Sequence, residues 1–437
     1  MISGQRFAVV IAVVAALVVP AAAKAGVATV AGGTAEYVAR SGEANAVSVT
    51  FNGTDIVVRD TGARVMARRG CRRVSASEAR CDPSGVSEVL VDLGDLADTS
   101  LVEVPVFATQ LGGPGNDVLN GGSQTDALDG GTGADAMSGG GDPYDHVLYD
   151  SRTAPVTITL DGVADDGEAG EGDNVGADIE RATGGSGDDL IVGNAAENFL
   201  LGGPGNDVLV GAAANDDLDG GPGADEFQGG DGIRDVVRYE DRAASVTVTI
   251  DGVANDGEAG EGDNLELDVE DVFSGAGNDL LVGSDAGNIL LGGQGDDVID
   301  GGLGGDLQAG GPGFDTVTYA SRTNPITGEW TSYCFNGEAN EFDCIEQDIE
   351  RIVGGFGDDV ISAYSKDDGT AVVEGGPGND YLGASSFFAT TTLIGGNGDD
   401  TLQSSNGLAD TDLCGAGADS VTRDALDTVG ADCEFVS

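Results

Sequence analysis

The chain has 437 residues, of which 75 are glycine, and its 77 acidic residues outnumber 19 basic ones to give a net charge of −58. Such a charge excludes binding to nucleic acid by neutralisation of phosphates, and it predicts an expanded coil unless cations are supplied. Glycine is about twice as frequent as in an average protein, but the sequence repeats every nine residues and prolines number only 11, which excludes a collagen helix.

Residues 1–25 have the pattern of a secretory signal peptide. Arg6 is the charged segment, residues 7–19 are the apolar segment, and two A-x-A cleavage sites place the cut near Ala23 or Ala25. The apolar run is too short to span a bilayer comfortably, and no later stretch approaches spanning length. We therefore expect a secreted, extracellular and soluble chain without a transmembrane anchor after cleavage.

Residues 26–111 contain short alternating segments, such as 47–51, 56–58 and 89–93, separated by Gly, Asn and Asp. This pattern predicts strands that either start the repeat region or form a small β cap on its end. The cluster of basic residues found here is interpreted either as a docking site for an anionic surface, such as cell-wall polymer, or as charge that protects a sheet edge from pairing. The edge interpretation is favoured. The cluster consists of Arg59, Arg64, Arg68, Arg69, Arg72, Arg73 and Arg80.

From Gly112 onward the sequence is organised in units of nine residues. The central run, residues 184–235, reads GGSGDDLIV, GNAAENFLL, GGPGNDVLV, GAAANDDLD, GGPGADEFQ and GGDGIRD. Further uninterrupted runs occupy 112–145 and 274–315, and three inserts of equal length separate the blocks at 146–183, 236–273 and 316–353. Sparser units begin at Gly354, Gly375, Gly395 and Cys414. We expect a repeat region over 112–383, followed over 384–437 by sparse terminal repeats and a disulfide-clipped cap.

Each unit has the composition of a tight turn followed by a short strand. Glycines permit positive φ at the turn, and the acidic residue at the sixth place supplies oxygen ligands for a hard cation. The last three residues form a strand whose middle side chain points inward. In the central run these inward side chains are Ile191, Leu200, Leu209, Leu218 and Phe227.

The units resemble the RTX, or haemolysin-type, calcium-binding repeat GGxGxDxUx. The resemblance implies an all-β fold, a parallel β-roll or β-helix solenoid in which two nonapeptides form one coil. It also implies that calcium lies between a turn and the turn two repeats later. By this resemblance the calcium ligands are the sixth-place aspartates Asp117, Asp126, Asp135, Asp145, Asp189, Asp207, Asp216, Asp225, Asp235, Asp279, Asp297, Asp306, Asp315, Asp359, Asp380, Asp400 and Asp419.

Units two apart share one side of such a roll, so the central run separates into two columns. The units at Gly184, Gly202 and Gly220 match GGxGxD completely, whereas in the other column Asn198 replaces the aspartate and Ala214 replaces a turn glycine. A lost carboxylate lowers the charge of the ligand set, and a Cβ resists the turn conformation. We therefore expect calcium to bind more tightly in the complete column.

The first two inserts are close copies, VTITLDGVADDGEAGEGDN and VTVTIDGVANDGEAGEGDN, whereas the third has diverged. Each of these copies opens with an alternating strand that leads into an acidic loop. The loop is not an EF-hand, because counting from Asp161 places Gly172 where a bidentate glutamate is required. The sequence leaves open an additional calcium site of another geometry in the loop.

Six cysteines fall in the pairs Cys71/Cys81, Cys334/Cys344 and Cys414/Cys433. In an exported chain this spacing favours three local disulfides, although other pairings are formally possible. A zinc site is disfavoured, because the chain has no C-x-x-C and a single histidine. The last pair is expected to pin the final coil, since solenoid ends must be capped.

No catalytic motif stands out. His146, the only imidazole, follows a repeat aspartate, where an exposed strand position is expected, and the sequence has no G-x-S-x-G, H-E-x-x-H or P-loop. We predict that the chain is not an enzyme but a secreted calcium-binding protein that folds on calcium and acts as an extracellular structural or adhesive module. The alternatives are a secreted hydrolase or polysaccharide-modifying enzyme carried on the roll, and a calcium-dependent polysaccharide-binding protein.

Overall fold

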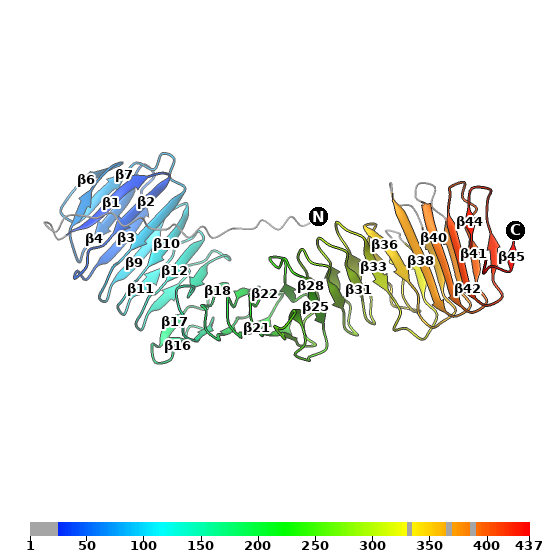
Figure 1. The fold of residues 1–437 in the computed structure, drawn as a ribbon. Helices are drawn as coiled ribbons and strands as arrows, with labels where there is room; N and C mark the ends of the chain where they lie inside the picture. The colour runs from blue at the N-terminus through cyan, green and yellow to red at the C-terminus, as the bar shows by residue number, and fades with distance from the viewer. Residues whose placement is uncertain (1–24, 330–333, 364–368, 385–389) are drawn as a thin grey trace.

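The computed structural model describes residues 25–329, 334–363, 369–384 and 390–437, so the expected signal peptide lies outside the described residues except for Ala25. The described residues form strands, turns and loops and contain no helix. Accordingly, this part of the chain has no helix that is long and apolar enough to cross a membrane. The all-β solenoid with parallel strand stacking that the repeats predict is confirmed (Figure 1).

Successive strands of the roll alternate between two sides, which we call side A and side B. On side A lie β1 (Gly26–Ala31), β2 (Thr34–Val38), β5 (Val65–Ala67), β8 (Glu88–Asp92), β10 (Phe107–Leu111), β12 (Asp126–Asp129), β14 (His146–Leu148), β18 (Arg181–Thr183), β20 (Phe199–Leu201), β22 (Asp217–Asp219), β24 (Val236–Arg238), β28 (Asp271–Phe273), β30 (Ile289–Leu291), β32 (Leu307–Ala309), β34 (Thr327–Glu329), β35 (Cys344–Ile345), β37 (Val360–Ala363), β39 (Tyr381–Ala384), β41 (Thr401–Gln403), β43 (Ser420–Thr422) and β45 (Phe435–Val436).

On side B lie β3 (Ala46–Phe51), β4 (Ile56–Asp60), β6 (Cys71–Arg73), β7 (Glu78–Cys81), β9 (Thr99–Glu103), β11 (Val118–Asn120), β13 (Ala136–Ser138), β15 (Val156–Thr159), β16 (Ala164–Glu168), β17 (Asp173–Val175), β19 (Leu190–Val192), β21 (Val208–Ala213), β23 (Glu226–Asp231), β25 (Val246–Thr249), β26 (Gly257–Glu258), β27 (Asn264–Leu265), β29 (Leu280–Val282), β31 (Val298–Asp300), β33 (Asp315–Thr318), β36 (Ile349–Val353), β38 (Thr370–Pro377), β40 (Thr390–Asn397), β42 (Thr411–Ala416) and β44 (Thr428–Val429).

The core is a narrow stack of inward side chains. On side B, Ile191 of β19 pairs in parallel register with Leu209 of β21, which in turn pairs with Phe227 of β23. On side A, Leu200 and Leu218 stack in the same way. All five are buried, as the repeat pattern predicts. Each three-residue strand sends only its middle side chain inward, so one unit gains only about 1.5–3 kcal/mol from apolar burial.

The N-terminal strands belong to the same two sides. β8 pairs with β10 and β10 with β12 on side A, while β9 pairs with β11 on side B. Strand pairing therefore continues without a break from residues 26–111 into the first repeats.

The basic cluster lies at the N-terminal end of this stack, where β6 is the outermost strand of side B. Arg72 on β6 pairs with Asp55 at 2.7 Å, and Arg59 pairs with Glu78 at 2.9 Å. These salt bridges lie at the end of side B, and the role of the cluster, edge protection or docking, stays a prediction.

The first two inserts widen side B. Between β13 and β19 the sheet on side B is lengthened by β17, β16 and β15, whereas on side A β14 pairs directly with β18. Figure 1 shows a bend in the roll at this point, with β16 and β17 on its outer side. In the second insert, β25 and β27 likewise join side B, through β29 and β23.

The third insert lies on the opposite side. Its strand β35 pairs with β32, and β34 pairs with β37, both on side A. The cause is the number of repeats before it. The runs before the first two inserts contain four and six units, whereas the third run contains five, so it ends on the other side of the coil. The parity of each run therefore decides which side its insert joins.

All three expected disulfides are present: Cys71–Cys81, Cys334–Cys344 and Cys414–Cys433. The first joins β6 to β7 at the N-terminal end. The last joins β42 to the segment that follows β44, the last strand of side B. Two of the three crosslinks therefore hold the ends of the solenoid, where a coil has a neighbour on one side only.

Reduction of Cys414–Cys433 is expected to fray the terminal coils first, because these coils are stabilised by stacking on one face alone. Hydrogen exchange with and without reductant would measure the effect. We expect faster exchange after residue 400 and unchanged protection in residues 184–235. A uniform loss of protection along the chain would contradict the local role of this crosslink.

Candidate calcium-binding turns

The turns of successive coils stack backbone against backbone. In the turn that begins at Gly202, Gly203 has a φ of 101°, and a Cβ there would overlap the carbonyl oxygen of Gly185, two units earlier. A Cβ on Gly205 would likewise overlap the carbonyl oxygen of Gly187. Glycine is therefore required for conformation and for close approach. We call the space between two turns that stack on the same side a gap. Two carbonyl oxygens of each turn, such as those of Gly185 and Gly187, point across this gap toward the next turn.

A ladder of aspartates connects the stacked turns. The backbone N–H of Asp189 donates to Oδ1 of Asp207 at 2.8 Å, and the N–H of Asp207 donates to Oδ1 of Asp225 at 2.8 Å. The pattern recurs in the first run, where the N–H of Asp117 donates to Asp135, and in the third, where Asp279 donates to Asp297. Each aspartate therefore reaches back across the gap to the turn two units earlier.

The second carboxylate oxygen is what distinguishes these aspartates. It is buried and has no hydrogen-bond partner among the described residues, although a buried oxygen without a partner costs about 1–3 kcal/mol or more when charged. It lies close to the first glycine of its own turn, since a Cβ on Gly202 would overlap Oδ2 of Asp207 and a Cβ on Gly220 would overlap Oδ2 of Asp225. The aspartates with such an unpartnered oxygen are Asp117, Asp135, Asp207, Asp216, Asp225, Asp235, Asp297, Asp306, Asp380, Asp400 and Asp419.

Burial makes the ionised form of these groups expensive. Loss of hydration, together with the neighbouring charge of Asp189, raises the pKa of Asp207 to about 7. The pKa values of Asp225 and Asp306 are each raised to about 8, chiefly by burial and then by the charges of Asp263 and Asp343, respectively. A row of buried carboxylates that resist ionisation calls for a cation in the gaps.

The donor set fits calcium. Carboxylate and backbone carbonyl oxygens are the hard ligands that Ca²⁺ takes, in flexible sets of six to eight. Among the described residues no three His, Cys, Asp or Glu side chains converge to hold a metal ion. A site between two turns would therefore combine a ladder carboxylate with glycine carbonyls rather than a cage of side chains.

Six predicted ligands remain, and two of them, Asp145 and Asp279, also have a buried Oδ2 without a hydrogen-bond partner among the described residues. Asp145, Asp279 and Asp315 each accept a backbone N–H across the gap, from Asp126, Val246 and Asp297. Three others use Oδ2 within their own turn, where it accepts a glycine N–H at 2.6–2.7 Å and is less available to a cation: Asp126, Asp189 and Asp359.

The ladder also extends beyond the predicted residues. The N–H of Asn45 contacts Asp98, and the N–H of Asp98 donates to Asp117 at 2.7 Å. Asp98 closes the turn Leu93–Asp98, in which Leu96 occupies a glycine place with a φ of 78°. At the other end, Asp410 accepts the N–H of Thr391 at 2.7 Å. The sequence signal that could have revealed the turn Leu93–Asp98 was Gly94 at the second place and Asp98 at the sixth, without the other glycines of the repeat.

His146 is buried, not exposed as the sequence suggested. It opens β14, and its Nε2 lies 2.7 Å from the hydroxyl of Thr183 on β18. Burial, together with the charge of the nearby Arg181, lowers its pKa to about 4, so the imidazole is neutral at ordinary pH. The expectation of exposure was wrong because the insert brings β18 against β14 at this point.

The chain is a β-solenoid of parallel coils. Its stacked turns hold buried carboxylates without partners close to glycine carbonyls, and such a set of oxygens suits a hard cation. The family model of the RTX calcium-binding nonapeptide repeat (4 copies) matches residues 111–143, 174–209, 201–233, 273–308, 347–382 and 390–407. The chain is therefore an RTX-repeat protein with calcium-binding repeats. A search of curated proteins found no match to it.

At two ladder positions of side A an asparagine replaces the aspartate, and its side chain is hydrogen-bonded at both. Asn198 accepts the N–H of Asn194 at 2.7 Å and donates to the Glu180 carbonyl at 3.2 Å. Asn288 makes the equivalent bonds, to Ser284 and to the Glu270 carbonyl. In the following turn of the central run, Ala212 and Ala214 hold φ values of 81° and 77°, a strained conformation for residues with a Cβ.

Asp207→Ala, in the complete column, is expected to weaken calcium binding about ten-fold or more, since bonds to charged groups contribute about 1.5–3 kcal/mol. Asp216→Ala, in the strained column, is expected to cost markedly less, because its turn contains Ala212 and Ala214. Calorimetric titration of both variants compares them directly. Equal losses of affinity would contradict a difference between the columns.

Proposed function

We propose that the chain is a secreted protein that folds on calcium and serves as an extracellular structural or adhesive module. The observation that carries the proposal is the ladder of buried Oδ2 atoms without partners, repeated in register along all three runs. Such a ladder is stable only when cations enter the gaps, so metal binding and folding form one equilibrium. Extracellular calcium modules bind at about 10⁻⁴–10⁻³ M, which suits a chain that stays unfolded where calcium is scarce and folds outside the cell.

A structural role is supported by the share of the described residues that the solenoid occupies. The described residues are occupied by strands of the roll, its inserts and its two ends, and the single histidine is buried and neutral. An elongated, rigid, acidic solenoid presents a long surface, as repeat proteins that bind extended partners do.

Calorimetry with calcium and, separately, with magnesium tests the binding activity of the purified chain. We expect calcium to bind with a strong heat signal and magnesium to bind poorly, because Mg²⁺ demands octahedral geometry and retains its water. A glycan array and a cell-wall pull-down, each with and without EDTA, test the adhesive role. Binding that disappears in EDTA supports adhesion, whereas substrate turnover by the pure protein would favour the enzyme alternative.

A further inference from the structure

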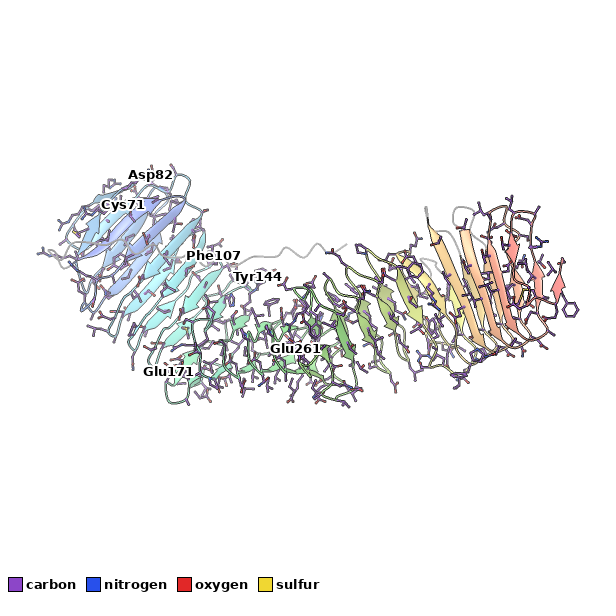
Figure 2. All side chains as sticks on the ribbon, in the orientation of Figure 1. Cys71, Asp82, Phe107, Tyr144, Glu171 and Glu261 are labelled. Carbon is purple, nitrogen blue, oxygen red and sulfur yellow. A yellow bond between two sulfur atoms is a disulfide. The ribbon has the colours of Figure 1, made fainter. Side chains whose placement is uncertain are left out.

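Each insert brings four side chains together at matching positions, which we call a quartet. It consists of a tyrosine, an arginine three residues later, a glutamate and an aspartate. The quartets are Tyr149, Arg152, Glu171 and Asp173 in the first insert, Tyr239, Arg242, Glu261 and Asp263 in the second, and Tyr319, Arg322, Glu341 and Asp343 in the third. Figure 2 labels Glu171 near the bend and Glu261 further along the roll. The third insert, although diverged in sequence, keeps all four.

The aspartate of each quartet continues the ladder. Asp173 accepts the N–H of Asp135 at 2.8 Å, Asp263 that of Asp225 at 2.9 Å, and Asp343 that of Asp306 at 3.0 Å. In each insert, Oδ1 therefore plays the same part as in an ordinary repeat. The gap between the last turn and the insert turn is built like the gaps within a run.

The second carboxylate oxygen of the quartet aspartate differs from that of the repeat aspartates. Oδ2 of Asp173, Asp263 and Asp343 accepts the hydroxyl of the quartet tyrosine at 2.9, 2.8 and 2.9 Å. At Asp135, Asp225 and Asp306, the aspartates of the preceding repeat turns, the same oxygen has no hydrogen-bond partner among the described residues. The N-terminal end of the chain repeats this solution, because the hydroxyl of Tyr37 donates to Oδ2 of Asp60 at 2.7 Å. A tyrosine thus satisfies the oxygen that a cation would otherwise bind.

A guanidinium pairs with the glutamate of each quartet, and its positive charge acts to lower the pKa of the quartet aspartate against the larger effect of burial. Arg152 and Arg242 each place Nη1 3.2 Å from their quartet glutamate, and Nε of Arg322 lies 3.8 Å from Glu341. All three arginines are largely buried, and each guanidinium lies about 6 Å from the ring of its quartet tyrosine.

Arg242 also bonds the repeat turn that precedes its insert. Its Nη2 donates to the carbonyl oxygen of Gly221. Gly221 is the second glycine of the last side-B turn before the insert, and the corresponding carbonyl of the preceding turn, on Gly203, faces Gly221 itself. The guanidinium therefore bonds a carbonyl of the kind that lines the gaps within a run.

We propose that Arg152, Arg242 and Arg322, with their tyrosines, take the place of a calcium ion in the three gaps between a repeat turn and an insert turn. The inserts are then metal-free joints between calcium-loaded blocks of repeats. The proposal rests on the proposed calcium binding of the repeat turns. A calcium ion in the same gap would be repelled by the buried guanidinium, and the carboxylate oxygen it needs is bonded to tyrosine.

The test counts calcium ions per folded chain by native mass spectrometry at saturating calcium. Asp263→Asn removes the carboxylate of an insert gap and is expected to leave the count unchanged. The matched control Asp207→Asn, at the same ladder position within a run, is expected to lower the count. Loss of an ion in Asp263→Asn as well would overturn the proposal. Absence of calcium from the wild-type chain would instead refute the underlying calcium-binding function.

A second measurement needs no variant and so does not depend on whether Asp263→Asn folds. Crystals of the wild-type chain grown with calcium would locate the ions by their anomalous scattering. We expect ions beside Asp207 and Asp297, and none bonded to Asp173, Asp263 or Asp343. An ion bonded to Oδ2 of any of these last three would overturn the proposal.

Discussion

Removal of calcium with EDTA is expected to convert the chain from a β-rich roll to an expanded coil. Each unit buries one large apolar side chain, a gain of about 1.5–3 kcal/mol, whereas ordering the backbone costs about 1–2 kcal/mol for every residue of the unit. Without metal the ladder also holds buried carboxylates such as Asp207 and Asp225 against each other. Calcium supplies the missing stabilisation, because its binding free energy is available only to the folded chain.

Circular dichroism in EDTA and in millimolar calcium measures this change. We expect a coil spectrum without metal, a β spectrum with calcium, and little recovery with magnesium at the same concentration. The transition should be reversible on adding calcium back. A complete β spectrum in EDTA would show that packing and the disulfides alone hold the roll, and it would contradict folding on calcium.

The repeats could be predicted from sequence because every local signal agrees with the fold. Around Asp207, the glycines, the aspartate and the inward Leu209 recur at fixed places, so the turn, the ladder and the core all follow from one period. The disulfides were predictable for a related reason, since each cysteine pair lies close in the chain.

The inserts could not be derived in the same way. Tyr149 and Arg152 meet Glu171 and Asp173 only after the chain has formed a hairpin, so no short pattern marks the quartet. The acidic loop left open an additional calcium site. However, both carboxylate oxygens of Asp166 accept backbone hydrogen bonds, from the N–H groups of Thr159 and Val175. The N-terminal turn at Asp98 was missed because Leu96 adopts a conformation that sequence rules assign to glycine.

Acidification is expected to restore β structure to the metal-free chain. In the absence of calcium, burial raises the pKa of Asp207 to about 7 and those of Asp225 and Asp306 to about 8, against about 3.9 for an unfolded aspartate. Between about pH 4 and pH 8 the folded state therefore binds more protons than the unfolded state. Its stability is greatest at the acidic end of this window and is lost as the pH rises through the folded-state pKa values.

Circular dichroism in EDTA, titrated from pH 8 to pH 5, measures this dependence, and we expect β signal to increase as the pH falls. Asp225→Asn provides the matched control. A neutral amide oxygen can still accept the Asp207 N–H but carries no charge. Asparagine also occurs naturally at two ladder positions, Asn198 and Asn288. The variant should fold more readily than the wild type in EDTA at pH 8, with a smaller gain on acidification. A metal-free chain that stays unfolded at pH 5, or a variant no more stable than the wild type at pH 8, would show that buried carboxylate charge is not what opposes folding without calcium.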